Sequence, residues 1–404
     1  MSSLDAPVRT PTRVLRPAEL RRDLAVPDLT DPAGGLHAVQ LVVGAAVRAL
    51  RTAWGTPVRV VRGHPVVDVA DNYDVLGFTP SAVARDVRHT RYVTPTKVLR
   101  THTSALVPPA LRALAAEAPA TAPADVLVAA PGIVYRRDSV DRWHAPTPHQ
   151  LDLWRVRGVG AEAGVRGPRC SVTELEAMAA AVVGAVLPGH EHRLVPATHP
   201  YTVHGRQIDV AIEDGSGDVR WVEIGECGVA HPEVLARCGL DAGLVSGLAM
   251  GLGLDRLVML RKGMADIRLL RATDDRVAAQ LGDLSPYRPV SACPAIVRDL
   301  SITVGSGVVA EDLGDRVREA LGADADKVES VAIVSETPYG ELPDAARRRL
   351  GMAPGQRNVL VRVVLCRLDR ALRRCEANAL RDAIHACLHE GRPGEGVTGE
   401  SPCA

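Results

Sequence analysis

The 404-residue sequence has few aromatic residues and few lysines, and it carries no net charge. It contains one phenylalanine, Phe78, and only three lysines among 48 basic residues, so arginine supplies nearly all of the positive charge. A neutral chain gives no overall electrostatic sign of nucleic-acid binding. Locally, however, residues 345–374 hold nine arginines and one acidic residue. Two explanations stay open for this stretch: the arginine codons of a GC-rich genome, and a surface that faces phosphates.

The sequence also lacks the patterns of a membrane or disulfide-rich protein. It has no apolar run of about 18 residues, so we expect no membrane-spanning helix. The first 30 residues contain no apolar stretch of the signal-peptide type. The eight cysteines are dispersed and form no CxxC pair. This argues against a zinc site or a disulfide framework and favours a reducing, cytoplasmic location.

Apolar spacing predicts the elements of the N-terminal part. Residues 1–34 are rich in proline and aspartate, and we expect them to form a flexible segment. Apolar residues at helical spacing predict a helix over residues 36–54, which ends at Gly55. Short strands are expected at residues 58–61 and 66–69.

A hairpin and a glycine-rich run follow in the middle of the chain. Alternating apolar residues on both sides of the turn at 214–217 predict an antiparallel hairpin. Residues 248–261 are interpreted as a strand, a glycine-lined turn and the start of a helix. Gly251 and Gly253 have no Cβ and would let a flat ligand approach the backbone, and Arg256 would face its phosphates. This pattern favours an antiparallel sheet with flanking helices.

The C-terminal part predicts a second, smaller unit that begins after a boundary near residues 281–285. Its pattern is strand, helix, strand, strand, helix, which is typical of a small α+β sandwich. The expected elements are a strand at 298–304, a helix at 311–321, strands at 328–334 and 359–366, and a helix at 376–388.

Three further stretches carry recognisable motifs. Residues 99–104 read LRTHTS, residues 134–152 include VYRRD and HQLD, and residues 221–235 read WVEIGECGVAHPEVL. Together with the run at 251–256, these stretches resemble the motifs of class II aminoacyl-tRNA synthetases, specifically those of the phenylalanyl-tRNA synthetase catalytic (alpha) subunit. The resemblance covers residues 35–390 and, in its C-terminal part, is similar to the single-chain organellar form.

The resemblance implies an α+β fold with two functional parts. Residues 35–282 would form the class II catalytic core, built on an antiparallel sheet with flanking helices. Residues 285–392 would form a ferredoxin-like anticodon-binding domain, and residues 393–404 a tail. The implied substrates are ATP, an amino acid and tRNA, with Mg²⁺ as the metal. The implied protein is a monomer or a homodimer, and no membrane partner is expected.

The resemblance also assigns roles to individual residues. Arg136 and Arg256 would be the catalytic arginines that grip the ATP phosphates. The other ATP-binding positions are His144, Glu223, Gly251 and Gly253, with Glu223 also the candidate ligand of Mg²⁺. The amino-acid-binding positions are His102, Ser104, Gln150, Asp152, His199, Tyr201 and Ala249. The candidate tRNA-binding residues are Arg347, Arg348, Arg349, Arg357, Arg373 and Arg374.

Several positions depart from the family pattern. His199 and Tyr201 stand where the family has two phenylalanines that pack on the substrate ring. Asp152 replaces a glutamate in the pair that holds the amino group, and Val203 and Gln207 replace two further glutamates. The residue that stacks on adenine in the family is Pro148 here. One altered pocket contact is worth about 1–3 kcal/mol, so strict selection of phenylalanine is in doubt.

Three functions remain open from the sequence. The first is a phenylalanine–tRNA ligase-like enzyme that makes an aminoacyl adenylate and transfers it to tRNA. The second is a paralogue that activates a different, more polar amino acid for a specialised pathway. The third is a catalytically degenerate protein that binds tRNA. The retained arginines, with Glu223, His102 and Gln150, argue against the third.

Overall fold

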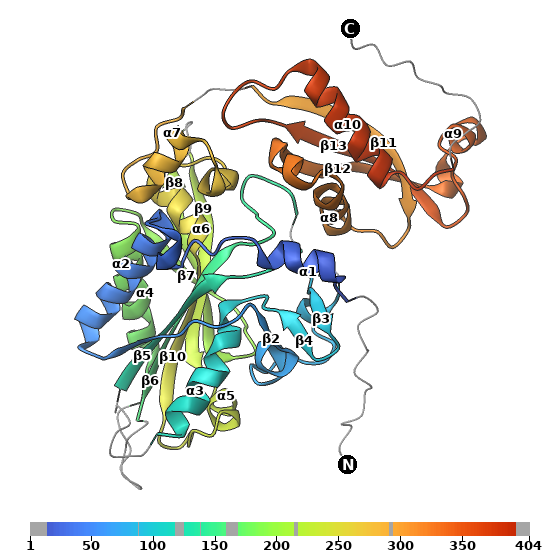
Figure 1. Cartoon of the computed structure of the whole chain (residues 1–404). Helices are drawn as coiled ribbons and strands as arrows, with labels where there is room; N and C mark the ends of the chain where they lie inside the picture. The colour runs from blue at the N-terminus through green and yellow to red at the C-terminus, as the bar shows by residue number, and fades with distance from the viewer. Residues whose placement is uncertain are drawn as a thin grey trace, which may run out of the picture. The chain divides into compact units, whose positions relative to one another are not determined.

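The protein is described from a computed structural model, which covers residues 14–87, 89–117, 125–137, 139–158, 169–213, 217–290 and 294–392. The chain forms two compact units (Figure 1). Unit 1 comprises Met1–Arg136, Thr147–Met264 and Gln280–Tyr287, and unit 2 comprises Arg137–Pro146, Ala265–Ala279 and Arg288–Ala404. The predicted tail at 393–404 lies outside the described residues.

A seven-stranded sheet forms the centre of unit 1, with the strands in the order β1-β5-β6-β10-β9-β8-β7. Every neighbouring pair is antiparallel except β1 and β5. The predicted antiparallel sheet and its hairpin are confirmed, because β8 and β9 are the two arms of that hairpin. The strands are β1 (Val58–Val60), β5 (Asp125–Ile133), β6 (His149–Arg157), β7 (His192–Pro196), β8 (Thr202–Glu213), β9 (Val219–Ala230) and β10 (Ser246–Gly253).

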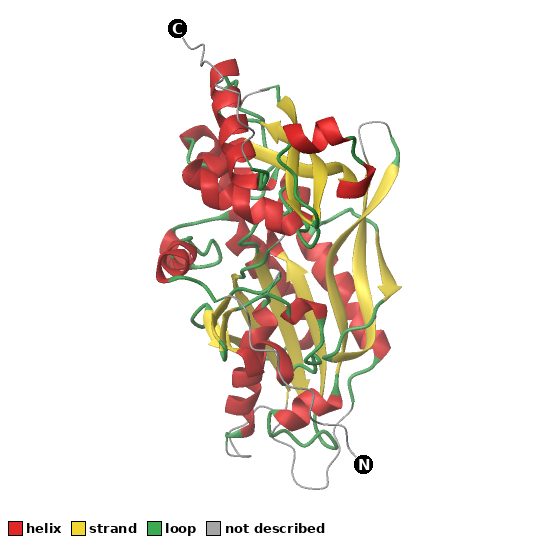
Figure 2. Cartoon of the chain, turned by 90° about the vertical axis from the view of Figure 1, so that its right-hand side faces the viewer, coloured by secondary structure: helices red, strands yellow, loops and turns green. Residues whose placement is uncertain are grey.

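Helices flank this sheet, as Figure 2 shows in red beside the yellow strands. Contacts join α2 (Ala38–Trp54) to α4 (Val172–Val186) and α6 (Leu254–Lys262), and α4 and α6 also contact the sheet. By contrast, α3 (Val107–Ala115) and α5 (Pro232–Arg237) contribute to a buried cluster with Trp154 and Ala249. The candidate site residues on β6 and β10 therefore share a face with α3 and α5.

The first long helix ends where the sequence predicts, at Trp54, and begins two residues later than predicted, at Ala38. The His37 side chain accepts a hydrogen bond from the Val39 backbone N–H, and Gly55 closes the helix with a left-handed φ of 64°. Glycine adopts this conformation without a steric penalty, which is why it commonly follows the last helical residue. The apolar face of α2 is buried, including Val39, Val42 and Leu50.

The glycine-rich run differs from its prediction. Gly251 and Gly253 are not in a turn, because β10 continues through both of them and α6 begins directly at Leu254. Pairing with β6 extends as far as Gly253 opposite Gln150. Glycine is still required nearby, since a Cβ on Gly225 would lie 2.1 Å from the backbone oxygen of Gly251. Close approach of two strands, and not a turn, explains part of the glycine pattern.

The N-terminal segment is more ordered than expected. Residues 1–13 lie outside the described residues, but α1 (Pro17–Leu24) is a helix, and Leu15 and Leu20 pack against a buried cluster at Leu99. Asp23 forms an ion pair with Arg91 at 2.9 Å. Asp28 accepts a hydrogen bond from the backbone N–H of Ile133 at 3.1 Å. Specific aspartate contacts, which have no periodic signature in the sequence, hold this segment.

A small second sheet in unit 1 supports the LRTHTS segment. It joins β2 (Val66–Asp68), β4 (Lys97–Leu99) and β3 (Tyr92–Thr94). Directly after β4, the buried Arg100 donates hydrogen bonds to the backbone oxygens of Ile133 at 2.7 Å and Gly63 at 2.9 Å. These bonds fix the chain before the 3₁₀ turn Thr103–Leu106.

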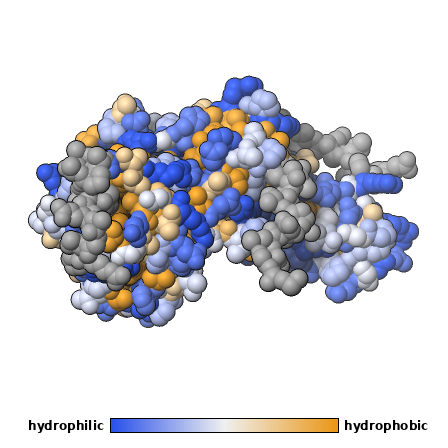
Figure 3. Space-filling view, turned by 90° about the horizontal axis from the view of Figure 1, so that it is seen from below, coloured by the Kyte–Doolittle hydropathy of each residue, from blue (hydrophilic) through white to orange (hydrophobic). Residues whose placement is uncertain are grey.

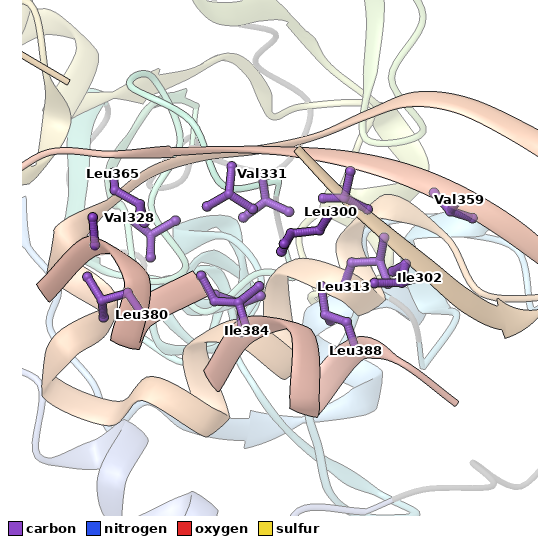
Figure 4. Close-up of a cluster of buried hydrophobic side chains, with 14 of the residues drawn as sticks. Leu300, Ile302, Leu313, Val328, Val331, Val359, Leu365, Leu380, Ile384 and Leu388 are labelled. Atoms are coloured by element: carbon purple, nitrogen blue, oxygen red, sulfur yellow. The ribbon is translucent and has the colours of Figure 1, made fainter. Parts of the chain in front are cut away.

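Unit 2 contains a three-stranded antiparallel sheet in the order β11-β13-β12. The predicted order of strand, helix, strand, strand and helix is observed from β11 (Ile296–Gly305) onwards, with a short α-helix, α9 (Asp344–Arg349), inserted before the last strand. Within the described residues its elements are α7 (Asp275–Ala278), β11 (Ile296–Gly305), α8 (Ala310–Leu321), β12 (Val328–Pro338), α9 (Asp344–Arg349), β13 (Gln356–Leu365) and α10 (Arg374–Leu388). Figure 4 shows side chains of α8 and α10, such as Leu313 and Ile384, packed with those of the strands.

Hydrophobic and hydrophilic residues are interspersed over the face seen in Figure 3. Singly exposed apolar side chains such as Val60 and Val83 are ordinary on a protein surface and carry no functional argument. In the ranges that the structure describes, no helix combines the length and apolar character needed to cross a bilayer.

Candidate active site

The register of three neighbouring strands brings two carboxylates to one place. Gly251 on β10 pairs with Asp152 on β6 and with Glu226 on β9. Residues that pair directly across strands project from the same face of a sheet. A Cβ on Gly251 would meet no atom within 4 Å. The two carboxylates therefore flank open space above a glycine, where a ligand can approach the backbone.

Asp152 is held inside this site by hydroxyl groups. Its side chain accepts a hydrogen bond from Thr103 Oγ1 at 2.7 Å and from the indole N–H of Trp154 at 3.3 Å. Only 3% of the residue is exposed. Burial raises the pKa of Asp152, although the hydroxyl hydrogen bonds of Thr103 and Ser104 oppose this shift. The Thr103 backbone N–H also donates to Gln150 Oε1 at 3.3 Å, so one residue positions both predicted amine acceptors.

Aromatic rings form a wall beside these groups. Tyr201 lies with its ring centroid 6.4 Å from those of Trp154 and Phe78, and 5.7 Å from that of His199. Phe78 lies 5.6 Å from His102. Ala249, the small residue predicted at this position, pairs with Trp154 across β6 and β10 and is buried. The predicted amino-acid-binding residues thus come together although they derive from separate stretches of the chain.

Glu226 is the accessible carboxylate of the site. Its Oε2 lies 3.1 Å from His199 Nε2 and accepts a hydrogen bond from the Tyr201 hydroxyl at 3.4 Å. The Glu226 side chain is 41% exposed. The contact with His199 lowers the pKa of Glu226, and burial opposes that shift. Glu226 is therefore ionised under ordinary conditions.

His102 is neutral in the site. Both of its ring nitrogens are buried and have no hydrogen-bond partner among the described residues. Burial, and then the positive charge of Arg136, lowers the pKa of His102 to about 3. Unsatisfied buried nitrogens are costly, so their presence is consistent with a polar ligand that completes them.

The two predicted catalytic arginines are each held by a hydrogen bond to a backbone oxygen of unit 1. Arg136 donates from Nε to the backbone oxygen of Thr101 at 2.8 Å, and Arg256 donates from Nη1 to the backbone oxygen of Glu223 at 2.7 Å. Burial and the charge of Glu226 raise the pKa of Glu223, while Arg256 and Arg136 both oppose this shift. Both positive charges therefore favour the ionised form of Glu223.

His144, predicted to bind ATP, forms a pair with an aspartate in unit 2. His144 lies on the segment Arg137–Pro146 of unit 2, where its Nδ1 is 2.8 Å from Asp141. Hydrogen bonds from His144 and from the Trp143 backbone lower the pKa of Asp141 to about 2 against the opposing effect of burial. His144 and Asp141 therefore form an ion pair within unit 2, and the ATP-binding role of His144 stays a prediction.

The six arginines predicted to bind tRNA all lie in unit 2, and they divide into two sets. Arg347, Arg357 and Arg373 form ion pairs within unit 2 with Asp344, Glu336 and Glu376. Arg347 also lies over the ring of Tyr339 at 4.6 Å. The second set, Arg348, Arg349 and Arg374, is exposed and makes no ion pair with any described residue.

The sequence analysis missed several residues of the site. Glu226 and Thr103 lie within the recognised motifs but received no role, and Trp154 lies two residues beyond the HQLD motif. Phe78 had a signal, because it is the only phenylalanine of the chain. Asp255, which is hydrogen-bonded to His149 Nδ1 at 2.8 Å, ties the start of β6 to the start of α6. The alternation of side chains along a strand places Glu226 and Gly228 on the same face of the sheet. It does not identify which strands are the neighbours of β9.

A separate cavity of about 280 Å³ is lined by residues that include Cys170, Ser171, Val203 and Leu235. None of the predicted site residues lines it. The candidate active site is therefore defined by the strand register and side-chain contacts described above.

Comparison with known protein families identifies the family of this chain. Residues 22–281 match the family described as the tRNA synthetases class II core domain (F). The chain belongs to this family. The match spans most of the chain and ends at residue 281, before the sheet of unit 2 begins at β11.

Individual relatives agree with this assignment. Proteins named phenylalanine–tRNA ligase alpha subunit are similar over 62–65% of this chain and 70–71% of their own length. They come from Gemmatimonas aurantiaca at 36% identity, Mycolicibacterium gilvum at 32% and Chromobacterium violaceum at 33%. A solved pyrrolysyl tRNA synthetase structure from Desulfitobacterium hafniense has a TM-score of 0.40 at 18% identity, over 58% of this chain and 73% of that one. That score is too low to support a conclusion.

Proposed function

We propose that this class II core activates phenylalanine or an analogue as the aminoacyl adenylate and transfers it to tRNA, the activity for which its relatives are named. One observation carries the proposal. The strand register places Asp152 and Glu226 on either side of the open space at Gly251, and Arg256 is bonded to the backbone of Glu223 on the same strand as Glu226.

The first reaction joins the amino-acid carboxylate to ATP. A carboxylate oxygen attacks the α-phosphorus, and the bond from that phosphorus to the bridging oxygen breaks as pyrophosphate leaves. The protein supplies no covalent nucleophile, so its contribution is positioning and charge neutralisation. Arg136 and Arg256 provide planar, permanently charged donors for phosphate oxygens. In the second step a tRNA hydroxyl attacks the adenylate carbonyl, and AMP leaves.

The class II family also implies Mg²⁺. In the part of the chain that the structure describes, no group of three or more His, Cys, Asp or Glu side chains is arranged to hold a metal ion. Mg²⁺ at nucleotide sites is usually held by one or two carboxylates together with substrate phosphates. The exposed Glu223 fits that requirement as a single protein ligand. Bound there, Mg²⁺ would help to neutralise the phosphates.

The amino acid would lie on the face of β6 and β10. Gln150 is proposed as an acceptor for its amino group, with His102 and Ser104 near its carboxylate. The aromatic wall at Phe78 supports binding of a flat side chain, as do His199, Tyr201 and the small Ala249. Aromatic rings at these separations favour offset or edge-to-face packing with another ring.

The tRNA would be held in part by unit 2, and we propose residues 285–392 as an anticodon-binding domain. Arg348, Arg349 and Arg374 are the best placed for phosphate contacts, since they are exposed and form no ion pair with a described residue. Arg347, Arg357 and Arg373 would first have to leave their carboxylate partners.

ATP–pyrophosphate exchange with each of the standard amino acids tests this function. We expect exchange that depends on phenylalanine or a close analogue. Replacement of Arg136 or Arg256 by alanine should reduce exchange by about 100-fold or more, the scale for one donor at a developing charge. Arg51→Ala, an exposed arginine on α2, is the matched control and should retain activity.

Two results would contradict the proposal. Absence of exchange with every amino acid, in a folded protein, would remove the enzymatic assignment and favour a tRNA-binding protein. Full exchange in Arg256→Ala would show that this guanidinium does not contact the nucleotide. Acylation of tRNA is then measured separately with labelled amino acid.

A further inference from the structure

Two carboxylates flank the open space at Gly251, and their surroundings give them different chemistry. Asp152 is buried, and its oxygens are occupied by donors from Thr103 and Trp154. The Glu226 side chain is 41% exposed, and its Oε1 has no partner among the described residues. A cationic ligand pairs best with a carboxylate that is ionised and still has free lone pairs.

We propose that Glu226, and not Asp152, binds the substrate ammonium group in this site. This inference rests on the proposed function. β10 lies between the strands of the two carboxylates, and Gly251 on β10 separates Asp152 from Glu226. Glu226 therefore reaches the same open space from β9. A longer side chain from the neighbouring strand thereby supplies the charge that the short, enclosed Asp152 does not present.

Two residues hold Glu226 in place for this role. His199 Nε2 and the Tyr201 hydroxyl both approach Oε2, so Oε1 has no donor among the described residues. His199 is itself fixed, because its Nδ1 lies 3.2 Å from Thr202 Oγ1. His199 and Tyr201 are therefore positioning residues for Glu226 as well as parts of the aromatic wall.

The surrounding charges support the same assignment. Arg136 and the contacts of His199 and Tyr201 all favour the ionised form of Glu226. Burial and the nearby charge of Glu226 disfavour ionisation of Asp152. When two carboxylates share a site, the less solvated one takes up a proton more readily. Asp152 then acts mainly as a hydrogen-bonding partner of Thr103 and Ser104.

The test compares an amino acid with its α-hydroxy counterpart, which lacks the ammonium group. Phenylalanine and phenyllactic acid are the first pair; if another amino acid supports faster exchange, that acid and its hydroxy analogue replace them. KM and kcat are measured by ATP–pyrophosphate exchange, and affinity by calorimetric titration. The variants are Glu226→Gln and Asp152→Asn, and Glu213→Gln, an exposed glutamate of β8, is the control.

We expect Glu226→Gln to raise the KM for the amino acid by on the order of ten- to a hundredfold, as for loss of a hydrogen bond to a charged group. Its KM for the hydroxy acid should change little, so the preference for the amine is lost. Asp152→Asn should retain that preference. Tyr201→Phe should lower it partially, since the carboxylate loses one positioning contact.

The reverse pattern overturns the inference: Asp152→Asn loses the preference for the amine while Glu226→Gln keeps it. Circular dichroism excludes variants that fail to fold, and Tyr201→Phe still reports on Glu226 if Glu226→Gln is one of them. If the wild type shows no exchange at all, the proposed function fails. The calorimetric titration then tests the role of Glu226 separately. If the wild type binds the amino acid and its hydroxy counterpart with equal affinity, or binds neither, Glu226 is not the ammonium site.

Discussion

At the scale of single residues, His102 and Glu226 show how the environment sets a protonation state. His102 belongs to a recognised motif, but its type alone does not tell whether it is charged. Burial and Arg136 keep the ring neutral, whereas contacts with His199 and Tyr201 keep Glu226 ionised. The site therefore combines a neutral imidazole with a carboxylate, an arrangement that only the packing of several elements produces.

The lowered pKa of His102 predicts an acid-sensitive contribution to stability. The unfolded histidine has an ordinary pKa near 6.5, while the folded one titrates near 3. Between these values the unfolded state binds the proton and the native state does not, so stability falls as the pH decreases from about 6.5 towards 3. The loss is no more than about 5 kcal/mol at 1.36 kcal/mol per pKa unit.

Urea unfolding of the wild type and of His102→Asn at several pH values measures this contribution. The variant should show a shallower decrease in the free energy of unfolding between pH 6.5 and the onset of acid unfolding. His89→Asn, at a half-buried histidine, provides the comparison. Parallel pH profiles for the wild type and His102→Asn would refute the assignment.

At the scale of elements, the glycines of β9 and β10 serve different purposes. A Cβ on Gly225 would meet the backbone oxygen of Gly251 at 2.1 Å, and neither strand can move away without breaking its pairing. A Cβ on Gly251 would point into open space. The first glycine is required for the sheet to form, and the second leaves room for a ligand.

This contrast gives a matched pair of substitutions. Gly225→Ala should destabilise the fold, since overpacking against backbone costs about 1–3 kcal/mol or more. Gly251→Ala should leave the melting temperature nearly unchanged while lowering exchange activity, because its methyl group occupies the ligand space. Thermal unfolding and ATP–pyrophosphate exchange on both variants measure the two effects. Equal loss of stability in both would contradict the different roles.

At the scale of the whole molecule, two separate cores support the two units. The core of unit 2 joins α8 and α10 to its three strands, and Ile384 is fully buried within it (Figure 4). The buried residues of unit 1 surround the seven-stranded sheet that carries the candidate active site. If unit 2 binds tRNA, damage to its core should separate tRNA binding from amino-acid activation.

Ile384→Ala tests that separation. Loss of a large buried side chain should destabilise unit 2 by about 2–5 kcal/mol. We expect lower tRNA affinity in a filter-binding assay, with ATP–pyrophosphate exchange retained. Val297→Ala, half exposed on β11, is the control and should affect neither measurement. Loss of exchange together with tRNA binding would argue against separate roles for the units.

The sequence by itself determined the family, the antiparallel sheet and the order of the main elements in both units. It did so because helical and strand periodicity, together with the ordered motifs, depend on local spacing along the chain. Only the tertiary structure decided that Glu226 lies opposite Asp152 across Gly251, that α1 is ordered, and that Gly251 and Gly253 continue a strand. Those features depend on which strands become neighbours and in what register. Such pairing is set by the packing of segments far apart in the chain.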